Sequence, residues 1–273
     1  MKIKNFKLAL ITGGSSGIGL ALARSLAQEG ISLCLLARDE IKLDQAKTEL
    51  QALTTHKDQQ ITTISCDIRN FDELKQHLET WTNEAGVPDL VINSAGVTYP
   101  GYFEDLEIET FHWLMDVNYF GTLHILKYLL PKMMQRGSGS VVNISSQAGF
   151  IGVFGYSGYS ASKYAVRGFT DVLRAEMKPH GIRFHVVYPP DTQTPQLEFE
   201  KPLKPEETKA LTGTSSLLTA DQVAQDILKG VETGRYVIIP GFEGKVLFRL
   251  ANLLGNLTYP IMDWMIRRAQ REK

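Results

Sequence analysis

Short apolar runs alternate with segments of helical period along almost the whole chain, and this alternation constrains the fold more than any other feature. The apolar runs cover residues 8–12, 32–37, 61–66, 90–93, 140–145, 183–188 and 236–239. The segments of helical period cover residues 17–29, 40–53, 71–84, 109–136, 158–178 and 220–233. Strands buried on both faces are continuously apolar, and intervening helices connect parallel strands. The pattern therefore predicts an α/β fold, a doubly wound parallel sheet of about seven strands with helices on both faces.

The same pattern predicts one domain over residues 1–273. It contains neither a Pro/Gly/Ser-rich linker nor an internal repeat, and 273 residues suit a single α/β core. Residues 195–218 depart from the pattern, with Pro195, Pro202 and Pro205, and we predict that they form a mobile substrate lid. Residues 243–273 are predicted to form an amphipathic C-terminal extension.

Composition and charge exclude several classes of function. The 29 Lys and Arg against 30 Asp and Glu leave a formal charge of −1, so nucleic acid is not expected as a partner. Cys34 and Cys66 lie in predicted strands, which favours core packing and a cytoplasmic location. The polar N-terminus predicts no export signal, and no window reaches the roughly 18 apolar residues of a membrane span. The six histidines lack metal-ligand spacing, so no metal site is predicted.

A glycine-rich sequence, TGGSSGIG at residues 12–19, lies between the first predicted strand and the first predicted helix. Glycines in this position let the backbone approach a pyrophosphate, which the amides at the helix N-terminus then bind. A loop that binds ATP needs a lysine after the last glycine, and this chain has Leu20. The alternative is a glycine-rich turn without a ligand. The residues predicted to bind a dinucleotide here are Gly13, Ser15, Ser16, Gly17, Ile18 and Gly19.

The end of the second predicted strand indicates which dinucleotide is preferred. An acidic residue there would bind the ribose hydroxyls of NADH, whereas an arginine can pair with a 2′-phosphate. Arg38 holds this position, and Lys42 follows one helical turn later. Asp39 complicates the pattern, and Arg38 as a solvated surface charge is the alternative. We predict NADPH/NADP+ as the cofactor, bound in part by Arg38 and Lys42.

The third and fourth predicted strands end in residues suited to an adenosine. Asp67 can accept a hydrogen bond from the adenine amino group, and Ile68 can cover the ring. Asn93, Ala95 and Gly96 follow at the end of the next strand, where small residues leave room for a ribose. Ligands of open α/β sheets bind at these strand ends. For Asp67 alone, a helix N-cap is the alternative.

Tyr159 and Lys163 carry the most specific chemistry. A spacing of four places both on one face of a helix, where the ammonium is expected to lower the pKa of the phenol. Tyr159 could then exchange a proton with a carbonyl oxygen, and Ser146 at the end of the fifth strand could bind that oxygen. Asn118 is a fourth candidate, with a structural hydrogen-bonding role as its alternative. The predicted catalytic residues are Asn118, Ser146, Tyr159 and Lys163.

In this order over about residues 7–240, the motifs resemble the short-chain dehydrogenase/reductase family, which has a Rossmann-type fold. The resemblance implies that Tyr159 is the acid/base, that Lys163 also binds the nicotinamide ribose, and that Ser146 orients the substrate carbonyl. It implies that Asn118 holds a water in a proton relay. It also implies that Pro189, Thr192 and Thr194 bind the nicotinamide and phosphate side. The usual Pro-Gly pair after the sixth strand is Pro-Pro here.

Residues 103–107, 145–149, 154–155, 159–163, 176–179 and 188–195 resemble most closely the branch of this family that serves sphingolipid synthesis. This resemblance implies NADPH-dependent reduction of a long-chain 3-keto amino lipid. The alternatives are another apolar ketone or alcohol, such as a steroid, retinoid or small carbonyl compound, and, more remotely, a non-catalytic NADP-binding sensor.

The segment 246–268 is apolar, contains aromatic residues and ends in Arg267 and Arg268. As a helix it could contact a membrane surface peripherally, on the cytosolic face, or it could pack on protein. The family resemblance implies a homodimer or homotetramer formed through the long helices near 109–136 and 158–178.

Overall fold

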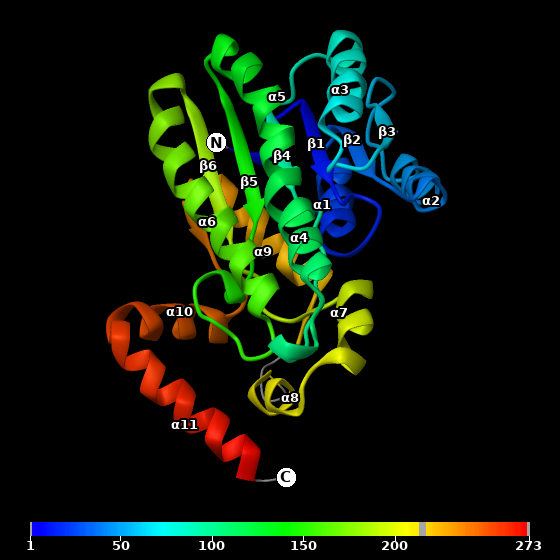
Figure 1. Cartoon of the computed structure of the whole chain (residues 1–273). Helices are drawn as coiled ribbons and strands as arrows, with labels where there is room; N and C mark the ends of the chain where they lie inside the picture. Colours follow the sequence, from blue (N-terminus) through cyan, green and yellow to red (C-terminus); the bar gives the residue numbers. More distant parts are fainter. Residues whose placement is uncertain (1, 213–216, 272–273) are drawn as a thin grey trace.

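The computed structural model describes residues 2–212 and 217–271. Within these residues a parallel sheet runs in the order β3-β2-β1-β4-β5-β6-β9 (Figure 1). Its strands are β1 (Leu8–Thr12), β2 (Ser32–Ala37), β3 (Ile61–Ser65), β4 (Leu90–Asn93), β5 (Gly139–Ile144), β6 (Ile182–Val187) and β9 (Val237–Ile238). The chain starts in the middle of the sheet, winds outward to β3 and then returns to build the other half. This seven-stranded, doubly wound sheet confirms the predicted fold class.

Helices cover both faces of the sheet, which is why the strands are apolar throughout. Ala9 and Ile11 pack on one face, and Leu10 between them packs on the other. The helices on the first face are α1 (Gly17–Gln28), α2 (Glu40–Gln51) and α9 (Ala220–Glu232). Those on the second face are α3 (Phe71–Ala85), α5 (Gly121–Arg136) and α6 (Ser157–Met177). Cys34 and Cys66 are buried free thiols in the core on the second face, as predicted.

The helix predicted over 109–136 is interrupted. The structure has α4 (Ile108–Met115), a π-helical turn (Asp116–Phe120) and then α5. Asn118 lies in the turn, and its side chain is bonded to the backbone of Val97 and to Ser162 on α6. These contacts hold the wider turn, a feature that often occurs at functional sites.

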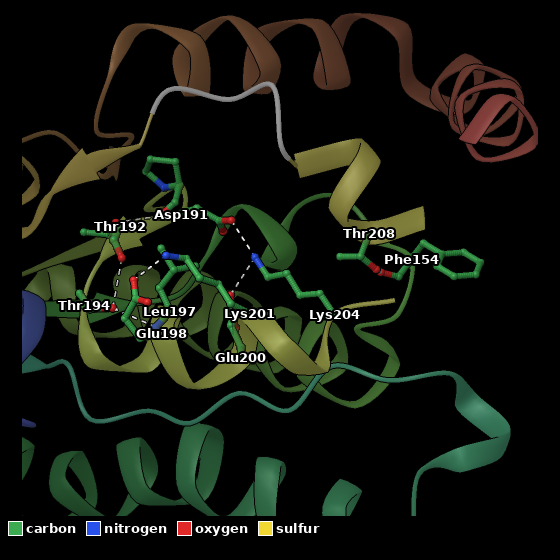
Figure 2. Close-up of polar contacts among 11 residues, drawn as sticks. Phe154, Asp191, Thr192, Thr194, Leu197, Glu198, Glu200, Lys201, Lys204 and Thr208 are labelled. Carbon is green, nitrogen blue, oxygen red and sulfur yellow. Dashed lines mark hydrogen bonds and ion pairs between the residues drawn. The ribbon is translucent and has the colours of Figure 1, made fainter. Parts of the chain in front are cut away.

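The predicted lid contains regular structure. Helix α7 (Pro195–Glu200), a 3-10 turn (Lys201–Leu203) and α8 (Glu206–Thr212) lie below the sheet in Figure 1. Thr194 accepts a hydrogen bond from the amide of Leu197 and thereby caps α7, whose first residue is Pro195 (Figure 2). Strand β8 (Leu218–Thr219) pairs with β7 (Thr192–Gln193). Residues 213–216 of the predicted lid lie outside the described residues, and its mobility stays a prediction.

The C-terminal extension is two helices rather than one. Helix α10 (Phe242–Leu254) is followed by a 3-10 turn (Gly255–Leu257) and α11 (Thr258–Arg271), which lies beside α8 (Figure 1). Gly255 has a φ of 52°, a conformation that ends α10 and that side chains rarely adopt. None of the helices in the described part of the chain combines the length and apolar character needed to cross a membrane. Residues 272–273 of the predicted extension are not among the described residues.

Candidate active site

A cleft lies at the carboxyl ends of β1, β4, β5 and β6. It has two adjoining parts, which share Gly13, Ser16, Ala95 and Gly96 on their walls. The first part, the catalytic cavity, is lined by residues of the β5, α6 and α7 regions, including Tyr159. The second, the adenosine hollow, is lined by residues that follow β2 and β3. The elongated shape matches a dinucleotide that bridges the two halves of the sheet.

The glycine-rich loop has the backbone that phosphate binding needs. Gly13 and Gly17 have φ angles of 66° and 54°, which favour glycine. A Cβ on Gly19 would lie 2.3 Å from the carbonyl oxygen of Gly13. Within the described contacts, Ser16 at the N-cap of α1 accepts no capping hydrogen bond through its side chain. Gly17 and Ile18, the first residues of α1, line the catalytic cavity, so the amides at this helix N-terminus suit a pyrophosphate.

The charged side chains that follow β2 have different roles. The Asp39 carboxylate accepts a hydrogen bond from the Lys42 amide at 3.0 Å and so caps α2. This hydrogen bond lowers the pKa of Asp39. Arg38 and Lys42 both line the adenosine hollow, and Lys42 Nζ lies 3.4 Å from the Asp39 carboxylate. Asp39 lines this hollow too, but one of its oxygens caps α2 and the other pairs with Lys42, so Arg38 is the residue placed to pair with a 2′-phosphate.

The structure brings Asp67, Ile68, Ala95 and Gly96 together in the adenosine hollow. Asp67 is not a helix cap, since Asn70 caps α3. Its carboxylate lies 2.7 Å from the guanidinium of Arg69; burial opposes ionisation, but these hydrogen bonds hold the pKa of Asp67 below its usual range.

Asn93, by contrast, does not line the described cleft. It is buried, donates to the side-chain oxygen of Asn143 at 2.8 Å, and is absent from both cleft linings within the described chain. The bond links β4 to β5, so Asn93 supports the sheet end rather than the cleft wall.

Ser146 and Tyr159 converge on the catalytic cavity from β5 and α6. Burial raises the pKa of Tyr159, although its hydrogen bond with Ser146 acts in the opposite direction. This differs from the expectation that Lys163 lowers that pKa. The cause is the desolvation of the phenol, to which the charges of Glu200 and Asp191 add. Tyr159 therefore keeps its proton at neutral pH, as a proton donor must.

Lys163 lines the same cavity as Ser146 and Tyr159. Its Nζ donates to the carbonyl oxygen of Ile144 at 3.1 Å and lies 5.6 Å from the centroid of the Tyr159 ring. Burial lowers the pKa of Lys163 to about 8. A Cβ on Gly96 would lie 3.2 Å from this Nζ, so the absence of a side chain there leaves the ammonium accessible from the cleft.

Asn118 is a buried hub of hydrogen bonds. Its side-chain oxygen accepts from the amide of Val97 at 2.8 Å, and its side-chain nitrogen donates to the Val97 carbonyl and to Ser162. Ser162 donates in turn to the carbonyl oxygen of Tyr159. The structure thus supports a positioning role for Asn118, and its water-holding role stays a prediction.

The segment after β6 closes the cavity. Pro189, Thr192 and Thr194 all line it. The Pro189 carbonyl accepts from the Gln147 amide at 3.2 Å, which ties this segment to the loop of Ser146. A Cβ on Gly17 would lie 3.2 Å from the Thr194 methyl group, so the predicted nicotinamide and phosphate sides adjoin each other.

The sequence analysis did not identify four polar residues of this region. Tyr156, Asp191 and Glu200 line the catalytic cavity, and Lys204 bridges the two carboxylates (Figure 2). The signal that was present is the pair Thr194-Pro195, a helix-start sequence that predicts α7 and with it the placement of Glu200.

One group of side chains lies close enough together to share a metal ion, but the chemistry of its members does not favour one. In the described residues, Cys66, Glu73 and His77 bring potential ligand atoms within 4.8 Å of one another. Burial raises the pKa of Cys66 to about 11, so its thiol is protonated at neutral pH. Glu73 already accepts a hydrogen bond from Asn70. This group lies at α3, and the prediction of no metal site stays a prediction.

The chain is similar to known oxidoreductases in sequence and fold. The family model for short chain dehydrogenase matches residues 7–203. A 3-ketodihydrosphingosine reductase from Bos taurus is 38% identical over 242 residues, which cover 88% of this chain and 73% of the relative. A short-chain dehydrogenase structure from Streptomyces avermitilis is 26% identical, with a TM-score of 0.79 and 98% of both chains covered. An alcohol dehydrogenase from Thermococcus sibiricus, complexed with 5-hydroxy-NADP, is 26% identical, with a TM-score of 0.72. The match covers 85% of this chain and 95% of the dehydrogenase.

The matched residues 7–203 are most of the chain and include the glycine-rich loop, Ser146, Tyr159 and Lys163. The chain therefore belongs to the short chain dehydrogenase family of oxidoreductases.

Proposed function

We propose that this chain is an NADPH-dependent carbonyl reductase that reduces the 3-keto group of 3-ketodihydrosphingosine to a hydroxyl. The observation that carries the proposal is the convergence of Ser146 and Tyr159 on a cavity that continues into a dinucleotide-shaped hollow. The bovine relative bears the name of this reaction's enzyme, which supports the substrate. The apolar side chains of Val153 and Leu197 on the cavity wall suit a lipid-like ketone.

The chain's own residues would bind the ketone and protonate its oxygen. The Ser146 oxygen accepts from the Ala148 amide at 3.2 Å, and its hydroxyl, which is hydrogen-bonded to Tyr159 here, would donate to the ketone oxygen when a ketone is bound. Tyr159, protonated at neutral pH, would donate its proton to that oxygen as the ketone is reduced. NADPH, when bound, supplies the hydride for the carbonyl carbon. Lys163 would bind the nicotinamide ribose and favour the phenolate that remains on Tyr159.

The preference for NADPH rests on two cations. Arg38 and Lys42 line the adenosine hollow, where a 2′-phosphate would lie, while Asp39 is occupied as the cap of α2. The Thermococcus sibiricus relative holds an NADP derivative on the same fold, which supports this preference.

The test is cofactor consumption by the purified chain with 3-ketodihydrosphingosine in detergent micelles. We expect NADPH oxidation that depends on the ketone and is much slower with NADH. Turnover of a steroid, retinoid or small ketone, with none of the sphingoid ketone, would reject the substrate while keeping the catalytic residues. Tight NADPH binding without turnover of any ketone would favour the sensor alternative.

We also propose that α10 and α11 contact a membrane surface, where such a substrate resides. Phe242, Leu253 and Trp264 are 80%, 82% and 61% exposed, and Arg267 and Arg268 follow on α11. Exposed apolar side chains beside cations are typical of helices that lie on anionic lipid. Sedimentation with anionic vesicles tests this: Leu253→Asp combined with Trp264→Asp should abolish co-sedimentation and leave NADPH binding unchanged.

The predicted homodimer or homotetramer stays a proposal. Phe120 at the end of the π-helical turn, with Tyr164 and Val172 on α6, are exposed apolar side chains that a partner subunit would cover. Light scattering of the purified chain decides between a monomer and these assemblies.

A further inference from the structure

Three charged side chains form a group at the edge of the catalytic cavity; two of them are buried, and that of Asp191 is 36% exposed. The Lys204 ammonium lies 2.8 Å from the Asp191 carboxylate and 3.1 Å from the Glu200 carboxylate (Figure 2). The side chains of Lys204 and Glu200 are only 5% and 8% exposed. Asp191 comes from the segment after β6, Glu200 ends α7, and Lys204 follows the next turn. Folding of the lid therefore assembles this group.

Two carboxylates and one ammonium give the group a formal charge of −1. Because Asp191 and Glu200 both line the cavity and share one ammonium, their excess negative charge favours a positively charged ligand there. Of the described charges, Lys204 and Asp191 act on the pKa of Glu200. Burial raises the pKa of Glu200 and the charge of Asp191 adds to the rise, whereas the Lys204 ammonium and a hydrogen bond with Thr98 oppose it, as a bound ammonium group would. Lys163 lies elsewhere, with its Nζ on the Ile144 carbonyl.

The carboxylates face the reacting end of the cavity. Asp191 and Glu200 line the cavity together with Tyr156 and Tyr159, whereas Lys204 lines a separate hollow beside Tyr102. The rings of Tyr156 and Tyr159 lie 5.6 Å apart. The negative charges of Glu200 and Asp191 contribute to the raised pKa of both phenols. A cation bound by Glu200 would therefore lie near the Tyr159 hydroxyl, which is proposed to donate its proton to the ketone oxygen.

The proposed substrate carries a cation in that position. Its amino group is on the carbon directly bonded to the keto carbon, and an aliphatic amine is protonated at neutral pH. We infer that Glu200 binds the ammonium group of the 2-amino ketone while Tyr159 and Ser146 bind its oxygen, and that Lys204 and Asp191 hold Glu200 in place. This inference rests on the proposed function. It makes Glu200 a specificity-determining residue that separates 2-amino ketones from plain apolar ketones.

The test compares Glu200→Gln with the unaltered chain on two ketones in micelles. One is 3-ketodihydrosphingosine, and the other is its analogue with hydrogen in place of the amino group. We expect Glu200→Gln to lower kcat/KM for the amino ketone by about 30-fold, the scale of a lost hydrogen bond between charged groups. Turnover of the analogue should change little. Glu200→Asp, which keeps the carboxylate, should recover part of the activity on the amino ketone.

Glu198→Gln is the matched control, since Glu198 lies on α7 but is exposed and pairs with Lys201. It should leave both activities unchanged, and NADPH binding by each variant confirms its folding. Equal losses on both ketones, or an unaltered preference in Glu200→Gln, would overturn the inference and leave the proposed function standing. If the unaltered chain reduces neither ketone, the proposed function itself fails and the inference falls with it.

Discussion

The side-chain amide of Asn118 donates a hydrogen bond to Ser162 at 2.9 Å, and Ser162 donates to the carbonyl oxygen of Tyr159 at 2.7 Å. This chain of bonds joins the π-helical turn to α6. It explains why the turn and the catalytic helix keep a fixed relation, since all three partners are buried. It also gives Asn118 a role that does not require contact with the substrate.

Replacing Asn118 should destabilise the chain. Asn118→Ala leaves the amide and carbonyl of Val97 without their partner, and it removes one of the two hydrogen bonds of the Ser162 hydroxyl. The free energy of unfolding should fall by about 3 kcal/mol or more, because each buried polar group left unpaired costs about 1–3 kcal/mol. Urea unfolding of the variant and the unaltered chain measures this fall in the free energy of unfolding. Ser162→Ala, which keeps both bonds to Val97, should cost clearly less; equal losses would contradict this account.

Removing the Tyr159 hydroxyl should stop turnover and spare cofactor binding. Tyr159→Phe keeps the ring but deletes the proton donor, so the turnover number should fall at least about 100-fold, the usual contribution of a general acid. NADPH binding, followed by fluorescence, should persist. Tyr164→Phe on the exposed side of α6 is the control and should behave like the unaltered chain. Undiminished turnover in Tyr159→Phe would remove Tyr159 from the mechanism.

A methyl group on Gly19 should disturb the phosphate loop. The new Cβ would lie 2.3 Å from the Gly13 carbonyl oxygen, so backbone has to move. We expect Gly19→Ala to weaken NADPH binding and to lower stability by about 1–3 kcal/mol, as overpacking does. Gly168→Ala on α6 meets no described atom within 4 Å and should instead stabilise the helix by about 0.5–1 kcal/mol. Thermal unfolding and NADPH titration of both variants decide the matter.

Cofactor preference should depend on Arg38. Arg38→Ala should raise the KM for NADPH about tenfold or more, because a hydrogen bond between charged groups is lost, and should leave the KM for NADH nearly unchanged. Steady-state kinetics with both cofactors measures the ratio. Lys75→Ala, which removes an exposed cation on α3, serves as the control for net charge. A parallel change in both KM values would refute the 2′-phosphate role.

Lys163 should leave a signature in the pH dependence of stability. Burial lowers its pKa from 10.5 to about 8, so the folded chain disfavours its charge. Between about pH 8 and 10.5 the unfolded chain binds more protons at this site, and stability should rise with pH. Relative to Lys163→Met, the cofactor-free chain should gain up to about 3 kcal/mol over this range. Urea unfolding of both chains at several pH values gives the difference in their free energies of unfolding. A difference that stays constant with pH would contradict a lowered pKa for Lys163.

The strands and most of the cleft could be predicted because their signals are local. Apolar runs such as that of β2 follow from burial on both faces, and the glycine-rich loop places Gly13 and Gly17 where positive φ angles are required. Tyr159 and Lys163 share a helix face, so their proximity follows from spacing alone.

Features that depend on packing could not be predicted. The π-helical turn is held by bonds from Asn118 to residues far away in the sequence, and the raised pKa of Tyr159 reflects desolvation that spacing does not report. Asn93 follows a strand end as a ligand would, but Asn143 on the neighbouring strand takes its amide. The pairing of Lys204 with Asp191 exists only once the lid has folded.

The ring of Phe248 on α10 stacks on Tyr188 at 5.7 Å and meets Phe150 edge-on at 5.0 Å. Tyr188 directly precedes the Pro189 segment, and Phe150 closes the loop that carries Ser146. Helix α10 therefore packs behind both walls of the catalytic cavity and does more than attach the chain to a surface. Exchanging α10 for a different anchoring sequence would remove these ring contacts from the segments that carry Ser146 and Pro189.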